Sequence, residues 1–238
     1  MYNFFDNVCG ALARVWKKQM DIPMPEFLRE REQCGKTWET AAFPLTGWIA
    51  GTIITLPAVF IAWLFNIYAG TVVYALGAWT FMVFRDSGRS DGIIAEIFIS
   101  KFPDGQNQWR AVIPVLLQVI KFALFSVVFL CGNCWHLAMI TGGMFLMEAI
   151  LTLDGGFAPP LLDDSENSRR RMWITAIILG IISIILCRMP ALFGIAAFIV
   201  IWKIFQNRGE KVNTNFREIS FAGAVTGWVL LLAGVLTV

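Results

Sequence analysis

Long stretches of the chain contain almost only uncharged apolar residues, and polar residues gather in the intervals between them. The apolar stretches are continuous, whereas a lipid-facing β-barrel strand would alternate apolar and polar residues. Several stretches reach the roughly 20 residues that a helix needs to span the hydrocarbon core of a bilayer. The pattern therefore predicts an all-α, polytopic membrane protein with about seven transmembrane helices. The predicted spans are 44–66, 68–84, 111–131, 136–152, 172–188, 190–206 and 218–237.

The first 43 residues have a different pattern. Charged residues interrupt the apolar positions, which is unlike the apolar centre of a signal peptide. Apolar residues instead recur at helical spacing, which predicts an amphipathic helix on the headgroup region of the inner leaflet. A helix docked on the protein core is the alternative. The apolar positions are Phe4, Phe5, Val8, Cys9, Leu12, Val15 and Trp16. We therefore divide the chain into an N-terminal amphipathic cytoplasmic segment, 1–43, and a transmembrane helical domain, 44–238.

Composition and charge support this class and add an orientation. The chain is 57% hydrophobic and only 15% charged. Of its 19 Lys and Arg residues, 17 lie in four segments that fall on one side of the predicted spans: 1–43, 85–110, 153–171 and 203–217. Cytoplasmic segments of membrane proteins carry the excess of basic residues. We therefore expect these four segments, and with them the N-terminus, to face the cytoplasm.

Several common kinds of site are excluded by the residues that the chain lacks. No phosphate-binding loop of the GxxxxGK[ST] type and no GxSxG element occurs, and His136 is the only histidine. A Ser-His-Asp site in the cytoplasm and zinc catalysis are therefore not expected. No pattern indicates nucleic-acid binding, the lipid bilayer is the expected surrounding, and the sequence leaves a homo-oligomer open.

The segment 84–92, FRDSGRSDG, places charge and glycine directly where an apolar run ends. Mg²⁺ prefers one or two carboxylates together with water and substrate phosphate, so Asp86 and Asp91 are candidate metal ligands. Gly88 and Gly92 would allow a ligand to approach the backbone closely. Asp104 is a third candidate ligand, although its Pro-Asp-Gly setting is equally that of an ordinary turn. A solvated, charged loop is the alternative interpretation of the whole segment.

Two ionisable residues lie within predicted spans. Lys121 falls near the middle of 111–131, where an ammonium needs a polar cavity or a counterion, and Gln118 lies one turn before it on the same helix face. Glu148 lies near the cytoplasmic end of its span. The two charged residues either border one polar cleft between helices or form a direct pair with each other.

Two proline-containing elements near the first span carry a family resemblance. Segment 22–25 reads Ile-Pro-Met-Pro and segment 43–47 reads Phe-Pro-Leu-Thr-Gly, followed after about forty residues by the acidic segment that contains Asp86 and Asp91. In this order the chain resembles the cobalamin 5'-phosphate synthase family, also called adenosylcobinamide-GDP ribazoletransferase. The resemblance covers the layout of nearly the whole chain and the motifs of its N-terminal third.

The resemblance implies a function and a set of site residues. The family transfers adenosylcobinamide phosphate from its GDP ester to α-ribazole or its 5'-phosphate, with Mg²⁺ as cofactor, at the prokaryotic inner membrane. It implies Asp86, Asp91 and Lys121 as catalytic residues. The substrate-binding candidates are His136, Glu148, Gly88 and Gly92, and the metal ligands are Asp86, Asp91 and Asp104. The chain departs from the family pattern because its acidic motif lacks at least one aspartate and His136 replaces an arginine.

Other function classes stay open at this point. A phosphotransferase for a lipid alcohol would use a similar aspartate-rich site, but its usual DxxDGxxAR pattern is absent. A transporter or an inactive scaffold would use Lys121 and Glu148 for coupling or packing. A transporter should also show paired broken helices in two halves, and no such repeat is visible.

Overall fold

The structure is a computed structural model that describes residues 9–10, 13, 26–30, 39–86, 89–100, 108–154, 166–209 and 216–237. The described residues form helices without any strand, which confirms the all-α prediction. The helices are α2 (Glu26–Arg29), α3 (Glu39–Leu64), α4 (Ile67–Asp86), α5 (Arg89–Ile99), α6 (Gln108–Leu130), α7 (His136–Asp154), α8 (Glu166–Cys187), α9 (Met189–Gly209) and α10 (Phe216–Leu236).

Within the described part of the chain, four helices are long and apolar enough to cross a membrane. These segments are Ala42–Leu64, Val112–Leu130, Arg169–Cys187 and Met189–Gln206. They identify the chain as a membrane protein with transmembrane helices. Shorter apolar helices cover Ile67–Val83, His136–Leu151 and Phe221–Leu236. Each of the seven predicted spans thus coincides with a helix, whereas the number of seven spans stays a prediction.

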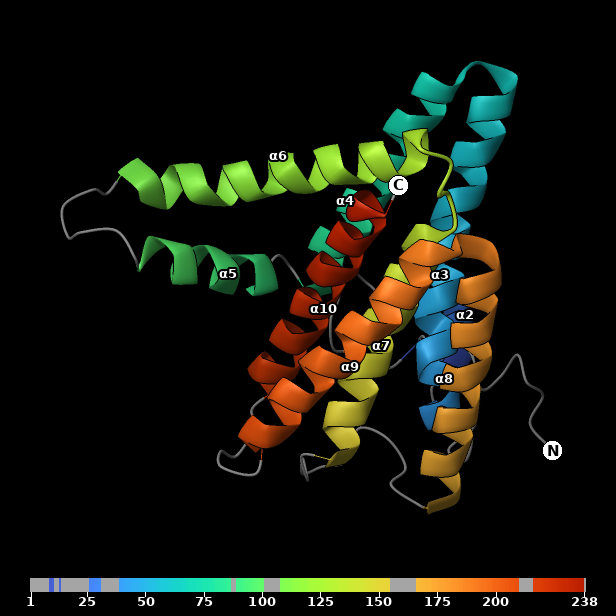
Figure 1. The fold of residues 1–238 in the computed structure, drawn as a ribbon, viewed down its shortest axis with the longest axis vertical. Coiled ribbons are helices and arrows are strands. Elements are labelled where there is room, and N and C mark those ends of the chain that lie inside the picture. Colours follow the sequence, from blue (N-terminus) through green and yellow to red (C-terminus); the bar gives the residue numbers. More distant parts are fainter. Residues whose placement is uncertain are drawn as a thin grey trace.

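Helix α7 lies at the centre of the bundle. Nearly every residue from His136 to Leu151 is buried, and α7 contacts α3, α8, α9 and α10 (Figure 1). The surrounding helices instead expose large apolar side chains, as expected where lipid covers them; Trp63 is 79% and Ile185 70% exposed. Helix α7 contains small and polar residues, among them Thr141, Gly142 and Glu148, which favour contact with other helices over contact with lipid.

The contact between α3 and α7 depends on small residues. A Cβ atom built on Gly47 would lie 2.5 Å from the carbonyl oxygen of Thr141, and one on Gly51 would lie 2.5 Å from the Cα atom of Ala138. The hydroxyl of Thr141 donates a hydrogen bond of 2.6 Å to the carbonyl oxygen of Gly47. Close approach of this kind is how membrane helices gain packing contacts. The Phe-Pro-Leu-Thr-Gly element therefore lies at a helix interface.

Replacing Gly51 by alanine is expected to lower the free energy of unfolding by about 1–3 kcal/mol, because the added methyl overlaps the backbone of α7, which cannot move aside easily. Gly180→Ala is the matched control, since its Cβ would lie 4.0 Å from the Cδ1 atom of Ile195 and cause no overlap. Thermal unfolding in detergent measures both variants. Equal melting temperatures for the two variants would contradict the close contact of α3 with α7.

Helix α5 corrects one prediction. The sequence predicted a loop over 85–110, but residues Arg89–Ile99 are helical and pack against α6 and α10. The reason is the apolar segment 93–99, IIAEIFI, which follows the glycines and supplies a face that can be buried; Ala95 is 2% exposed. In Figure 1, α5 and α6 run side by side and extend sideways from the bundle, in a direction different from that of α3 and α8. Helix α6 is thus not parallel to those two candidate spans.

Two further predicted segments can be compared only in part. The predicted loop 153–171 is helical from Glu166 onward, because a carboxylate in the first turn stabilises the start of α8. Of the predicted N-terminal amphipathic helix, only residues 9–10 and 13 are described. Cys9 is 2% and Ala13 0% exposed, so these two side chains are covered by protein. The remaining apolar positions of that helix lie outside the described residues.

Candidate functional site

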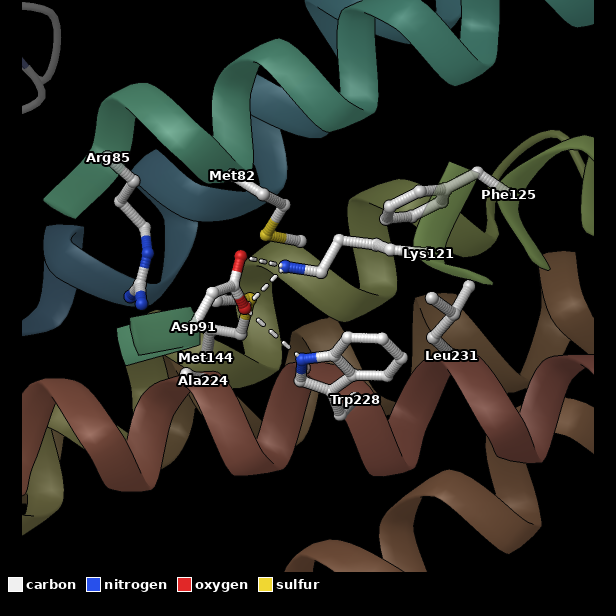
Figure 2. A pocket seen from close by; sticks show the side chains of 10 residues that line it. Met82, Arg85, Asp91, Lys121, Phe125, Met144, Ala224, Trp228 and Leu231 are labelled. Atoms are coloured by element: carbon white, nitrogen blue, oxygen red, sulfur yellow. Dashed lines mark hydrogen bonds and ion pairs between the residues drawn. The ribbon is translucent and has the colours of Figure 1, made fainter. Parts of the chain in front are cut away.

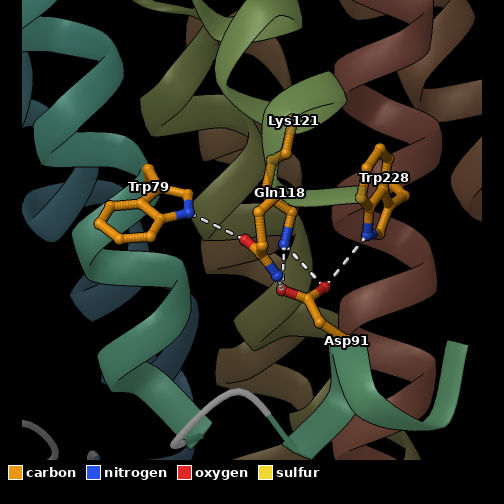
Figure 3. Close-up of polar contacts among 5 residues, drawn as sticks. All are labelled: Trp79, Asp91, Gln118, Lys121 and Trp228. Atoms are coloured by element: carbon orange, nitrogen blue, oxygen red, sulfur yellow. Dashed lines mark hydrogen bonds and ion pairs between the residues drawn. The ribbon is translucent and has the colours of Figure 1, made fainter. Parts of the chain in front are cut away.

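The candidate site is built around the carboxylate of Asp91, in the first turn of α5. The ammonium of Lys121, on α6, donates to both of its oxygens at 2.7 and 2.6 Å (Figure 3). Gln118 lies one turn earlier on α6 and donates to one of these oxygens at 2.8 Å. Residues three positions apart share a helix face, so α6 presents both donors to the same carboxylate. Asp91 therefore fixes α5 against α6.

Two tryptophans complete the polar network around Asp91. The indole N–H of Trp228, on α10, donates to Asp91 at 3.4 Å. The centre of the Trp228 ring lies 5.0 Å from the ammonium nitrogen of Lys121, which faces the ring. On the other side, Trp79 of α4 donates to the side-chain carbonyl oxygen of Gln118 at 2.9 Å (Figure 3). Four helices, α4, α5, α6 and α10, thus contribute to one network of hydrogen bonds.

The ionisation of Asp91 follows from these contacts. Burial disfavours the charged carboxylate, but the neighbouring ammonium of Lys121 and the hydrogen bonds to the carboxylate outweigh this cost. Together they hold the pKa of Asp91 below its usual value. Asp91 is therefore a carboxylate at neutral pH, although it is only 8% exposed.

A second buried ion pair joins the end of α4 to the C-terminal half of α7. The guanidinium of Arg85 contacts the carboxylate of Glu148, and the two residues are 1% and 2% exposed. Helix α10 comes close at this point, because a Cβ atom on Gly223 would overlap the carboxylate of Glu148. Two buried opposite charges cost less as a pair than either does alone, so each residue depends on the other for its place in the bundle.

The two ion pairs meet at one small cavity. Arg85, Asp91 and Lys121 line it together with apolar side chains that include Met82, Phe125 and Leu231 (Figure 2). Its volume is about 20 Å³, which is room for one water molecule. Cations surrounded by apolar side chains interact strongly with negative charge, because little water screens them. The site can thus stabilise an anionic group if the cavity opens.

The structure brings some of the predicted site residues together. Asp91 and Lys121 are in direct contact, and Glu148 reaches the same cavity through Arg85. Gly92 follows Asp91 in α5, is exposed, and has open space where a Cβ would lie. These positions stay candidates for a functional site.

Other predicted site residues lie elsewhere or outside the description. His136 is at the start of α7, where its Nε2 atom lies 2.7 Å from the carbonyl oxygen of Leu230, and it does not line the cavity. It precedes Glu148 by about 18 Å along the helix. The side chain of Asp86 and residues Gly88 and Asp104 lie outside the described residues.

The direct pair between Lys121 and Glu148, one of the two arrangements that the sequence left open, is replaced by two separate pairs. Lys121 contacts Asp91, and Glu148 contacts Arg85. The reason is that α5 folds back onto α6 and supplies a carboxylate from outside the apolar spans. The interpretation that both residues border a common polar region agrees better with this arrangement.

Arg85, Trp79 and Trp228 of the candidate site were not identified from the sequence. Arg85 follows the apolar part of α4 directly, and its position at a helix end was the available signal. Trp228 and Trp79 lie inside apolar helices, where aromatic residues are usual. The only signal for them was that a buried indole N–H needs an acceptor.

The described residues offer limited support for a metal. No group of three or more His, Cys, Asp or Glu side chains gathers within the described ranges. Asp91 supplies one carboxylate, and both of its oxygens already accept hydrogen bonds from Lys121. One carboxylate together with a substrate diphosphate is still a ligand set that Mg²⁺ accepts. In the described residues this carboxylate accepts hydrogen bonds from Lys121, Gln118 and Trp228 and lies beside two cations, so the metal stays a prediction.

Comparison of the chain with models of known protein families, with curated protein sequences and with solved structures finds no match.

Proposed function

We propose that the protein is a membrane-bound phosphotransferase of cobamide nucleotide-loop assembly. Its substrates would be GDP-activated adenosylcobinamide and α-ribazole or the 5'-phosphate of α-ribazole. A sugar hydroxyl of the ribazole attacks the phosphorus of adenosylcobinamide phosphate, the bond from this phosphorus to the GMP oxygen breaks, and GMP leaves. The proton of the attacking hydroxyl passes to a base. The proposal rests on the resemblance of the two proline-containing elements and the acidic segment to the cobalamin 5'-phosphate synthase family.

The contact between Asp91 and Lys121 is the structural observation that supports the proposal. These residues were candidates by their place in the sequence, 30 positions apart, and they lie together in a cavity that Arg85 also lines. Phosphoryl transfer is catalysed mainly by positioning and by stabilising negative charge. Lys121 and Arg85 supply two cations for phosphoryl oxygens, and Asp91 supplies a carboxylate that stays charged at neutral pH.

Mg²⁺ belongs to the proposal as a cofactor that binds with the substrate. When bound, it neutralises the charge of the diphosphate. Within the described part of the chain, Asp91 is the predicted ligand whose side chain faces the cavity. Its hydrogen bonds from Gln118 and Trp228 keep the carboxylate in place when Lys121 moves toward phosphate.

The membrane position is part of the same proposal. We place the protein in a prokaryotic inner membrane with its N-terminus and its basic segments in the cytoplasm, as the distribution of Lys and Arg predicts. Arg85 at the end of α4 and Asp91 at the start of α5 then lie near the cytoplasmic face. A large amphipathic corrinoid could reach the site from the interfacial region.

A non-catalytic membrane scaffold is the second candidate, and one observation favours it. Each described charge of the site has an opposite charge beside it, and the cavity between them holds no more than one water molecule. A scaffold needs no more than this closed arrangement. A phosphotransferase requires that the contact between Asp91 and Lys121 open when substrate binds.

Turnover separates the two candidates. Purified protein in detergent is incubated with Mg²⁺, GDP-cobinamide and α-ribazole, and GMP is quantified by chromatography. We expect GMP release by the wild-type protein and a fall of about 10²-fold or more in Asp91→Asn, which removes the charge and keeps the size. Glu96→Gln, at an exposed position on the same helix, is the matched control and should keep the activity. A folded wild-type protein that releases no GMP would favour the scaffold.

A further inference from the structure

A second cavity, of about 440 Å³, lies on the other side of α7. This volume falls within the range of roughly 300–1,000 Å³ that is typical of ligand sites. Its lining is almost entirely apolar and comes from α3, α7, α8, α9 and α10. Representative lining residues are Trp48, Leu146, Ile177, Gly180, Phe198 and Leu230. An apolar cavity of this size favours a hydrocarbon occupant.

The shape of the second cavity matches an extended chain. On α8 its lining residues recur every three or four positions from Trp173 to Ile184, which is a length of about 17 Å along the helix. One leaflet contributes about half of the roughly 30 Å hydrocarbon core. The cavity also reaches the surface, because Ile177 is 60% exposed whereas Leu230, at the back, is 3% exposed. A lipid chain can therefore enter it from the bilayer.

One end of the second cavity has a polar group without a protein partner among the described residues. Trp202 lines the cavity, and its indole N–H is buried without a hydrogen-bond partner within the described part of the chain. Burying such a donor is costly unless an acceptor reaches it. The Trp202 ring lies 5.6 Å from the ring of Trp173, as in the tryptophan pairs found at membrane interfaces. Protein atoms cover this nitrogen, so a rotation of the indole would be needed to bring its N–H to an ester or phosphate oxygen of a lipid in the cavity.

Basic side chains surround the same end. Arg170, one turn before Trp173 on α8, and Lys203, next to Trp202 on α9, are both exposed. The Lys203 ammonium lies 5.8 Å from the centre of the Trp202 ring. Basic pockets between helices on the cytoplasmic side of a membrane bind anionic lipid headgroups. The basic side chains at this end could bind a phospholipid headgroup, and the apolar interior beyond them could bind its acyl chain.

We infer that this cavity binds one acyl chain of an anionic glycerophospholipid, with the headgroup at Arg170 and Lys203. The inference does not depend on the proposed phosphotransfer, because the two cavities use different faces of the same helices. Met144 of α7 and Leu231 of α10 line the cavity at the ion pairs, whereas Gly143 and Leu230 line this one.

Photo-crosslinking tests the inference. The protein is reconstituted in phosphatidylcholine vesicles that contain phosphatidylglycerol with a diazirine group on one acyl chain, irradiated, digested and mapped by mass spectrometry. Gly180→Phe fills the cavity, since a Cβ at Gly180 has no neighbour closer than 4.0 Å. Gly180→Ala keeps the cavity open, and Ile178→Phe adds the same ring to an exposed position of α8 outside the lining. Ala176→Leu is a second, smaller filling variant.

We expect adducts on the lining residues of α8 and α9 in the wild-type protein, Gly180→Ala and Ile178→Phe. In Gly180→Phe the yield should fall about tenfold, because the added ring occupies the space that the acyl chain would fill. Ala176→Leu should show a smaller fall in adduct yield, and it replaces Gly180→Phe as the test variant if that protein does not fold. Unlabelled phosphatidylglycerol should compete better than phosphatidylcholine or free fatty acid. Equal labelling of lining and non-lining positions in every variant would show that the probe reports ordinary surface lipid, and this would overturn the inference. Equal competition by phosphatidylglycerol, phosphatidylcholine and free fatty acid would also overturn it.

Discussion

Replacing Lys121 by methionine is expected to lower the free energy of unfolding by about 3–5 kcal/mol, because the change leaves the buried carboxylate of Asp91 without its cation. Methionine keeps most of the length and apolar stem of lysine, so the loss of charge dominates. Denaturation by SDS in mixed micelles, followed by circular dichroism, measures the change. Lys203→Met removes an exposed lysine and should shift stability by less than about 0.5 kcal/mol.

The double variant identifies the partner of Lys121. In Lys121→Met with Asp91→Leu, both charges are gone, and stability should return to within about 1 kcal/mol of the wild-type value, since apolar residues often replace a buried pair without loss. Additive losses in the double variant, or a stable Lys121→Met, would mean that Asp91 and Lys121 do not depend on each other.

Replacing Glu148 by glutamine is expected to cost a similar amount, about 3–5 kcal/mol, because the guanidinium of Arg85 would remain buried beside a neutral amide. The exchange keeps the shape of the side chain, which matters where Gly223 lies against it. Glu166→Gln makes the same exchange at the exposed start of α8, and it is the control that should leave stability nearly unchanged.

Combining Glu148→Gln with Lys121→Met tests how the two pairs are arranged. This double variant leaves Arg85 and Asp91 as opposite charges beside one cavity, so the losses should fall short of additive. Full recovery to the wild-type stability would instead indicate a direct pair of Lys121 with Glu148. Comparison with the variant that combines Lys121→Met with Asp91→Leu separates the two pairing schemes.

The contacts of Lys121 show which features of the site can be predicted from the sequence. A lysine in the middle of an apolar helix predicts a counterion or a polar cavity, and the structure contains both. Glu148 seemed a natural partner because it also lies in an apolar segment. The actual partner, Asp91, comes from a segment whose glycines and charges predicted a loop. Local patterns do not encode that α5 turns back along α6, since this depends on packing between distant segments.

The two tryptophans of the network show a second limit of prediction from the sequence. Trp228 and Trp79 are large apolar residues in apolar helices, and such residues usually need no special explanation. Their indole N–H groups take part in the network only because α4 and α10 lie against the Asp91 region. Arg85 and Glu148 were easier to connect in principle, since opposite charges at equal membrane depth favour pairing. The sequence predicted the helices well and the polar contacts between them poorly.

The central claim is that the Asp91 carboxylate binds Mg²⁺ together with the diphosphate of the substrate, and calorimetry of Mg²⁺ with GDP tests it most directly. Mg²⁺ is titrated into the folded protein with and without GDP. We predict nucleotide-dependent Mg²⁺ binding by the wild-type protein and by Glu96→Gln, and its loss in Asp91→Asn under conditions where circular dichroism shows this less stable variant to be folded. Equal Mg²⁺ affinity in all three proteins, or no binding by the wild-type protein, would contradict the account and leave Asp91 and Lys121 as a structural pair.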